Sequence, residues 1–326
     1  MAGRYDAIVI GGGHNGLVTA AYLARAGKSV VVLERREMPG GCAVTEELWP
    51  GYQVSTGAYL ISLLQERIVR ELELERFGYR VLPKDPAFFS VFPDGRHLFF
   101  WQDEKKTLAE IAKFSTRDAV AYPKYEAYLE RLAVVVESLL LVTPPELPPK
   151  KPADFLEYLK LLARFRHLGR REMAGLVKIF TQSAADFLDE WFESPEIKVT
   201  LATDGVIGAN GGPRSAGTAY ILMHHCMGGV AGKRGLWEFV KGGMGAVSGA
   251  IAASARHSGA EIRTRAAVQR VLVREGRACG VVLENGDELR AQVVASNLDP
   301  RVTFQKLVEA RELEPEFRSS IEHFRV

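Results

Sequence analysis

A glycine-rich turn between a short apolar strand and a helix is the feature that most constrains this chain. Residues 7–10 read Ala-Ile-Val-Ile, a continuous apolar run typical of a parallel strand buried on both faces. The run leads into the turn Gly-Gly-Gly-His-Asn-Gly at 11–16, and a helical stretch follows to about Ala26, where Gly27 ends it. The order of strand, glycine turn and helix predicts the first half of a β-α-β unit.

The glycines of this turn have the spacing of a pyrophosphate-binding loop. Gly11 allows the tight turn, Gly13 lets the backbone approach a phosphate, and Gly16 lets the helix pack closely on the strand. The start of the helix would face the phosphates with its free N–H groups and positive dipole end. A purely structural turn is the alternative. We predict a phosphate-binding role for five residues: Gly11, Gly13, His14, Asn15 and Gly16.

A carboxylate follows at the distance expected of a ribose ligand. Residues 29–33 form a second apolar strand, and this strand ends at Glu34. An acid at this place accepts hydrogen bonds from the ribose hydroxyls of adenosine and repels a 2′-phosphate. This argues against NADP, although the positive charges of Arg35 and Arg36 would attract a 2′-phosphate and weaken the argument. We predict Glu34 and Arg35 as contacts of the adenosine half of a dinucleotide.

The segment after Glu34 separates FAD from NAD. It reads Glu-Arg-Arg-Glu-Met-Pro-Gly-Gly-Cys from Glu34 to Cys42. This resembles the acid-to-double-glycine signature of the flavoproteins with two dinucleotide-binding domains, a group that includes phytoene desaturases and amine oxidases. The resemblance implies FAD as the cofactor, with Gly40 and Gly41 close to its phosphate and ribityl region. Cys42 stands where many members have arginine.

Further segments resemble one branch of this group, which is named for a pyridine nucleotide-disulfide oxidoreductase domain, type 2, and is related to phytoene desaturases and carotene ketolases. The matching stretches are 13–18, 44–47, 204–228 and 242–246, and the resemblance runs from about residue 4 to about 305. It implies that Val268 places backbone against the adenine and that Gly243 lies on the flavin side of the substrate cavity. An ordinary buried valine and a plain helix start are the alternatives for these two residues.

The fold class that follows is α/β, with a Rossmann-like FAD-binding domain and an inserted, mostly helical α+β substrate domain. We expect the first part of the FAD-binding domain at 1–80, the substrate domain at 81–225 and the second part at 226–326. The expected helices are 65–75, most of 107–225 and 244–256; the expected strands are 88–92, 98–101, 261–264, 268–274, 278–284 and 288–295.

The resembled proteins continue well past the length of this chain. Their C-terminal part returns to the dinucleotide domain with a Gly-Asp strand, and nothing like it follows Arg301. We therefore expect that the third part of the FAD-binding domain is missing and that the affinity for FAD is poor.

Composition narrows the remaining classes. The 326 residues are 47% hydrophobic and 25% charged with a net charge of +2, which predicts about two domains and no nucleic-acid partner. The dinucleotide strand starts too early to leave room for a leader peptide, and the longest apolar run, 133–142, is too short to span a bilayer. The three cysteines form no Cys-x-x-Cys motif, so a reducing cytoplasm is the expected location.

Two other segments allow more than one interpretation. His224-His225-Cys226 could form a metal or acid/base cluster, but neighbours on a helix point about 100° apart, so a partly buried histidine pair is favoured. The basic, amphipathic stretch 161–171 suits either peripheral contact with a membrane surface or a solvated helix face, and the solvated face is favoured. We predict no metal site and assign no catalytic residue.

These observations together predict an FAD-dependent oxidoreductase. A hydride would pass from a small apolar substrate, of the isoprenoid or carotenoid kind that the resemblance suggests, to the flavin N5. The flavin carries the redox chemistry, which fits the lack of a catalytic triad or carboxylate pair. The alternatives are a non-catalytic flavin-binding or partner-binding protein, or an inactive fragment of such an enzyme. The sequence assigns no oligomeric state.

Overall fold

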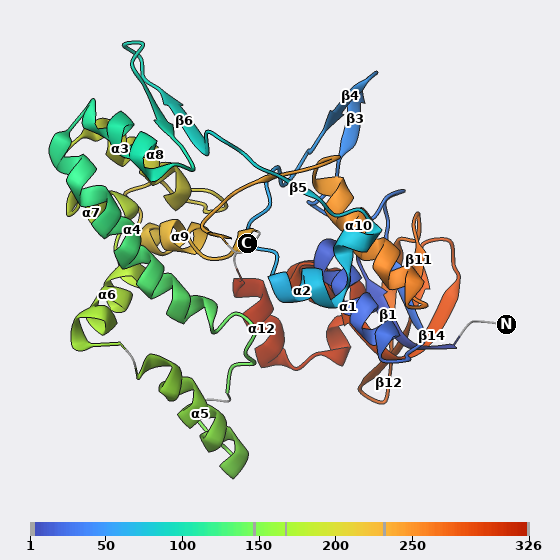
Figure 1. Cartoon of the computed structure of the whole chain (residues 1–326). Helices are drawn as coiled ribbons and strands as arrows, with labels where there is room; N and C mark the ends of the chain where they lie inside the picture. Colours follow the sequence, from blue (N-terminus) through green and yellow to red (C-terminus); the bar gives the residue numbers. More distant parts are fainter. Residues whose placement is uncertain (1–3, 146–147, 167, 231–232, 325–326) are drawn as a thin grey trace. The chain divides into compact units, whose positions relative to one another are not determined.

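The computed structural model describes residues 4–145, 148–166, 168–230 and 233–324, which fall into two compact units. The first unit comprises residues 1–82 and 239–326, drawn in blue to cyan and in orange to red in Figure 1. The second comprises residues 83–238 and is drawn in teal, green and gold. The second unit thus ends at residue 238, beyond residue 225, where the sequence predicts the end of the substrate domain. Each unit is described by itself.

The first unit is built on a six-stranded sheet in the order β11-β2-β1-β14-β13-β12. Strands β11, β2, β1 and β14 run parallel to one another. Strand β13 pairs antiparallel with β14, and β12 pairs antiparallel with β13. This arrangement confirms the predicted α/β, Rossmann-like fold. The strand bounds are β1 Arg4–Ile10, β2 Val30–Leu33, β11 Glu261–Arg263, β12 Val268–Arg274, β13 Arg277–Leu283 and β14 Glu288–Ser296.

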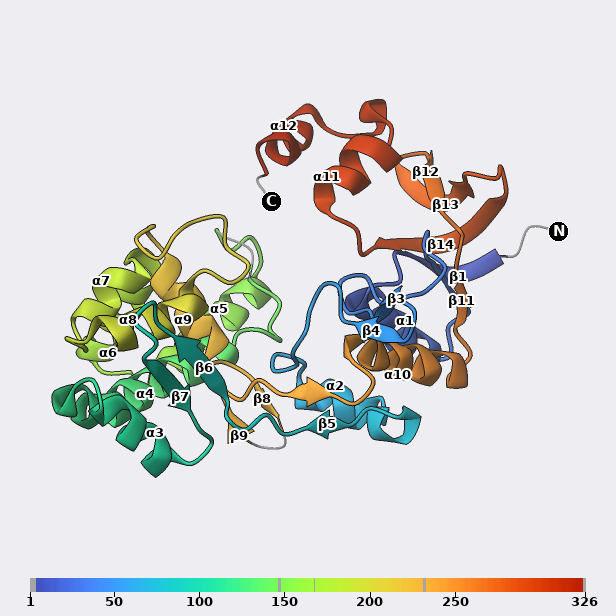
Figure 2. The same ribbon diagram turned by 90° about the horizontal axis from the view of Figure 1, so that it is seen from above.

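Both faces of the sheet are covered, which explains the continuous apolar runs in β1 and β2. Helices α1 (His14–Arg25) and α10 (Met244–His257) pack against each other on one face, as Figure 2 shows. Most of their buried residues are small, with six alanines, two serines and one glycine beside four larger apolar side chains, so the helices approach closely. Side chains of the other face form a second core: Ile8, Ile10, Val31, Leu33, Val281, Leu283, Leu289 and Leu307.

One predicted helix of this unit is wrong in its extent. The expected helix 65–75 is divided into α2 (Glu66–Glu71) and a 3-10 helix, η1 (Leu74–Phe77). Glu73 has a left-handed backbone with a φ of 51°, which ends α2. Two short antiparallel strand pairs complete this part of the unit: the hairpin of β3 (Glu46–Trp49) with β4 (Tyr52–Val54), and β5 (Val81–Leu82) with β10 (Phe239–Val240), which are distant in sequence.

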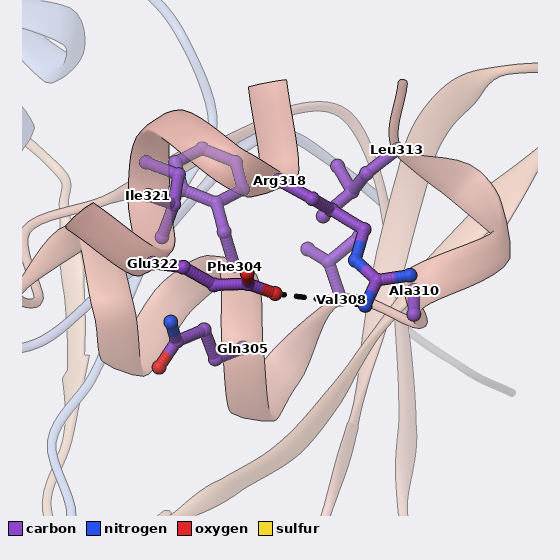
Figure 3. Close-up of a pocket in the computed structure, with 8 residues that line it drawn as sticks. All are labelled: Phe304, Gln305, Val308, Ala310, Leu313, Arg318, Ile321 and Glu322. Atoms are coloured by element: carbon purple, nitrogen blue, oxygen red, sulfur yellow. Dashed lines mark ion pairs between the residues drawn. The ribbon is translucent and has the colours of Figure 1, made fainter. Parts of the chain in front are cut away.

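The C-terminal segment of the first unit packs as short helical turns. These are α11 (Pro300–Val302), η3 (Thr303–Leu307), η4 (Ala310–Glu312) and α12 (Pro315–His323). They enclose a pocket of about 240 Å³ between Phe304, Leu313 and Ile321, beside the ion pair of Arg318 and Glu322 (Figure 3). The volume is below the usual range of ligand sites, about 300–1,000 Å³.

The second unit is mostly helical, as predicted. Its elements are the hairpins β6 (Phe88–Val91) with β7 (His97–Phe100) and β8 (Gly229–Val230) with β9 (Lys233–Arg234), and the helices α3 (Glu104–Ala112), α4 (Thr116–Glu137), α5 (Pro152–Phe165), α6 (Arg170–Thr181), α7 (Ala184–Asp189), α8 (Pro195–Ala202), η2 (Thr203–Gly205) and α9 (Thr218–His225). Asp118 of α4 is fully buried and accepts hydrogen bonds from the N–H groups of Glu193 and Ser194, at 3.0 and 2.8 Å. The start of α8 is thereby tied to α4.

The basic segment 161–171 does not form one continuous helix. It includes the end of α5 and the start of α6, and His167 lies outside the described residues. Helix α5 exposes apolar side chains as well as basic ones; the apolar ones are Phe155, Leu156, Leu159 and Leu162. Within the described ranges, no helix combines the length and apolar character needed to cross a bilayer.

Candidate dinucleotide site

The glycine turn lies at the edge of the sheet where the parallel strands β1, β2 and β14 end. The Gly11 N–H donates to the carbonyl of Leu33 at 2.9 Å, and the Asn297 N–H donates to the carbonyl of Ile10 at 2.8 Å. The turn is thus held between the strands on either side of β1. In open α/β sheets, ligands bind beyond the carboxyl ends of the strands at such a point.

Within the glycine turn, Gly16 is the position at which a side chain is least tolerable. A Cβ atom there would lie 2.2 Å from the carbonyl oxygen of Gly11, a backbone atom. Helix α1 could not keep its place on β1 with any larger residue. This agrees with the packing role predicted for Gly16 from the sequence.

The N-terminus of α1 offers free N–H groups to a ligand. Gly13 is the N-cap residue with an extended backbone, and no side chain caps the helix. The next two residues, His14 and Asn15, are exposed. Backbone N–H groups at an uncapped helix start, with the positive end of the helix dipole, suit a pyrophosphate.

Glu34 is fixed in place by two backbone N–H groups. Its side chain is only 6% exposed, and it accepts hydrogen bonds from Gly12 N–H at 2.7 Å and from Arg36 N–H at 2.9 Å. A carboxylate can accept about four hydrogen bonds, so acceptor capacity is left for the hydroxyls of a ribose. Arg35 is exposed, whereas the guanidinium of Arg36 pairs with Glu46.

The double glycine contacts the first glycine turn directly. The Gly40 N–H donates to the carbonyl of Gly12 at 2.7 Å, and Gly40 forms an isolated parallel bridge with Gly13. A Cβ on Gly41 would lie 3.1 Å from the Cα of Gly13. The structure therefore brings the two glycine segments and Glu34 together into one backbone-lined cradle.

Two predicted cofactor contacts lie beside this cradle. Gly243 precedes α10 with a φ of 77°, and a Cβ there would meet the Thr45 hydroxyl at 2.3 Å. This packing gives Gly243 a structural reason, and its contact with a cofactor stays a prediction. Val268 begins β12 two residues after Ala266, whose N–H donates to the carbonyl of Glu34 at 2.9 Å. The start of β12 is thus close to the adenosine end, and its contact with adenine also stays a prediction.

Asn297 is a candidate site residue that the sequence-based interpretation missed. It follows β14, and its side-chain Nδ2 lies 2.9 Å from the position of a Cβ on Gly13 and 3.2 Å from that of a Cβ on Gly16. Its amide therefore packs over the glycine turn. The sequence signal was the Ser-Asn-Leu-Asp-Pro stretch at 296–300, a helix-capping pattern directly after an apolar strand.

The two rings of the histidine pair in the second unit have different orientations, and the absence of a metal site stays a prediction. The rings of His224 and His225 are almost perpendicular, at 88°, with centroids 5.9 Å apart. Burial first, and the charge of His225 second, lower the pKa of His224. Among the described residues there is no group of three or more side chains that could hold a metal ion.

Comparison with known proteins identifies the class. The family model "Flavin containing amine oxidoreductase" matches residues 16–325, and the chain belongs to this family. Cyclohexylamine oxidase from Brevibacterium oxydans has the same fold: its structure matches with a TM-score of 0.55 at 22% identity and covers 98% of this chain and 62% of its own.

Relatives within the family are similar over most of the chain. Pyridine nucleotide-disulfide oxidoreductase domain-containing protein 2 of Rattus norvegicus is 43% identical over 318 residues, which are 93% of this chain and 55% of that protein. Phytoene desaturase of Cercospora nicotianae is 29% identical, over 94% of this chain and 47% of the desaturase. The chain spans about half the length of these relatives.

Proposed function

We propose that this chain carries the FAD-binding site of an oxidoreductase, in which a hydride passes from a substrate C–H bond to the flavin. The supporting observation is the cradle in the first unit, where the buried carboxylate of Glu34 and the two glycine segments meet. Bound FAD would supply the redox chemistry, by accepting a hydride at N5 and passing the electrons to a second acceptor. The residues of the chain bind and orient it.

The cradle fits the adenosine and pyrophosphate parts of FAD. The uncapped start of α1 would hold the pyrophosphate, and Glu34 would accept hydrogen bonds from the ribose. Gly40 and Gly41 would allow the cofactor to pass close to the backbone. The remaining predicted contacts are Gly11, Gly13, His14, Asn15, Gly16, Arg35, Gly243 and Val268, to which we add Asn297.

NADP fits this cradle less well than FAD. A 2′-phosphate would lie against the carboxylate of Glu34 without a free guanidinium to balance it from Arg36, because Arg36 is already paired with Glu46. Arg35 is exposed on this side, and Arg265, whose N–H donates to the carbonyl of Arg36, is paired with Glu37. Like charges at hydrogen-bond distance are strongly unfavourable.

We propose a small apolar molecule of the isoprenoid or carotenoid kind as the substrate. The support is the similarity of the chain to phytoene desaturase of Cercospora nicotianae and to pyridine nucleotide-disulfide oxidoreductase domain-containing protein 2 of Rattus norvegicus.

We further propose that the protein is cytoplasmic and that the exposed apolar and basic side chains of α5 make peripheral contact with a membrane.

The proposal is tested by reduction of the flavin. In the presence of FAD, the purified chain is expected to perturb the absorption spectrum of the flavin, and the bound flavin is expected to be bleached anaerobically by an oxidisable isoprenoid. The Gly16→Val variant at the same FAD concentration is expected to cause a much smaller perturbation. A wild-type chain that leaves the spectrum of free FAD unchanged would contradict FAD binding; a perturbed spectrum that no candidate bleaches would favour a non-catalytic flavin-binding protein.

A further inference from the structure

The second unit contains a cavity of about 670 Å³, within the range of small-molecule sites. It lies between α4, α9, the end of β7 and the segment after β9. Helix α9, gold in Figures 1 and 2, lies among the green helices, of which α4, α6 and α7 pack against it. All residues that line the cavity belong to this one unit.

Aromatic rings make much of the wall of this cavity. Trp101, Tyr125 and Trp237 line it, and Tyr125 is only 3% exposed. The Trp237 ring stacks on His225 with centroids 5.0 Å apart, and its Nε1–H donates to the carbonyl of His225 at 3.0 Å. The rings are therefore held in place and offer rigid apolar surface to a ligand.

Three polar groups at the wall have hydrogen-bonding capacity to spare. His225 Nδ1 lies 2.8 Å from the carbonyl oxygen of Ile221. A carbonyl only accepts, so Nδ1 carries the hydrogen, and Nε2 is left to bond with a ligand. Within the part of the chain that the structure describes, neither the Asp204 carboxyl nor the Tyr125 hydroxyl has a hydrogen bond. The Tyr122 hydroxyl, in contrast, donates to Glu126 at 2.7 Å.

Positive charges already lie near the Asp204 carboxyl at the cavity wall. Burial raises the pKa of the Asp204 carboxyl, and the nearby charges of His225 and Lys84 oppose this shift. Since Lys84 already supplies a positive charge, the carboxyl does not require a cationic ligand. Burial raises the pKa of the Cys226 thiol to about 12, so this thiol adds no negative charge to the wall.

We propose that this cavity binds the substrate, and that the substrate is an apolar alcohol whose hydroxyl is held by His225, Tyr125 and Asp204. The hydroxyl bonds to His225 Nε2 and to the Asp204 carboxyl and accepts from the Tyr125 hydroxyl, while the aromatic rings enclose the apolar body. The identity of this ligand as the substrate rests on the proposed function. His225 and Asp204 are then specificity-determining residues that select an alcohol over a hydrocarbon of the same shape.

The test compares three probes with one carbon skeleton: 4-phenyl-1-butanol, butylbenzene and 4-phenylbutylamine. Binding to the whole chain without FAD is followed by tryptophan fluorescence, because Trp101 and Trp237 line the cavity. We expect the alcohol to bind at least about tenfold more tightly than either of the other two, as expected from one or two net hydrogen bonds.

Variants of Asp204 and His225 show whether these residues carry the preference. Asp204→Leu and His225→Phe should each remove most of the difference between alcohol and hydrocarbon, and the affinity for butylbenzene should be kept or increased. If the leucine variant does not fold, Asp204→Asn, which keeps the shape of the side chain, takes its place and should give an intermediate ratio of the two affinities. Asp94→Asn, an exposed position in the hairpin turn of the same unit, is the matched control and should not change the ratio.

Equal affinity for alcohol and hydrocarbon, or a response to no probe, would overturn the proposal. Tighter binding of the amine would do the same and would indicate a site for an organic cation. None of these readouts depends on FAD. A failed FAD titration would therefore count against the proposed function, and a failed probe titration against the alcohol site.

Discussion

Gly16→Val is expected to weaken FAD binding by about 30- to 150-fold, which corresponds to about 2–3 kcal/mol. A Cβ at this position would lie 2.2 Å from the Gly11 carbonyl oxygen, and valine adds two methyl groups beyond it. Helix α1 must then move away from the strand, and its free N–H groups move with it. The measurement is an FAD titration by calorimetry, with the free energy of unfolding determined in urea.

Gly249→Ala is the matched control for this change. Gly249 lies in α10 of the same unit, and no atom is within 4 Å of the position of its Cβ. Alanine is a better helix former than glycine by about 1 kcal/mol, so stability should be kept or rise while FAD binding is unchanged. Equal FAD affinity of Gly16→Val and wild type would show that the glycine turn is not the phosphate site.

Glu34→Ala is expected to reduce both stability and FAD binding. The N–H groups of Gly12 and Arg36 would lose their acceptor in a place that is only 6% exposed. An unsatisfied buried donor costs about 1–3 kcal/mol, so we expect a loss of about 2–4 kcal/mol in the free energy of unfolding. Loss of the bonds to the ribose should weaken FAD binding by a further 10- to 150-fold, about 1.5–3 kcal/mol.

Two controls separate the two effects of Glu34. Glu34→Gln keeps one acceptor oxygen but turns an NH₂ group toward a backbone donor, so both losses should be intermediate. Glu37→Gln changes an exposed acid in the same loop, which pairs with Arg265, and should leave stability and FAD binding unchanged. If Glu34→Ala lost stability while binding FAD like wild type, Glu34 would be a structural residue only.

The positions of the first glycine turn and Glu34 could be predicted because they depend on neighbours in sequence, and their contact with a cofactor stays a prediction. A strand, three spaced glycines and an acid after the next strand define the cradle within residues 7–34. The second glycine segment was predicted from a resemblance, and the structure adds that Gly40 bonds to the carbonyl of Gly12. Local pattern and tertiary contact agree at this site.

The features that could not be predicted depend on contacts between distant parts of the chain. Asn297 reaches the glycine turn only because β14 pairs with β1, and the capping pattern at 296–300 does not indicate that pairing. The packing of Gly243 against Thr45 is of the same kind. The helix expected at 65–75 failed for a local reason, the left-handed backbone at Glu73, since glutamate is usually a good helix former.

Competition between ligands tests the central claim most directly, namely that the first unit binds the adenosine diphosphate half of FAD. FAD is titrated into the chain alone, in the presence of ADP and, separately, of FMN, which lacks the adenosine. We predict that ADP displaces FAD and that FMN at the same concentration does not. Displacement by FMN but not by ADP, or no binding of FAD up to about 1 mM, a threshold that corresponds to about 4 kcal/mol, would contradict the claim.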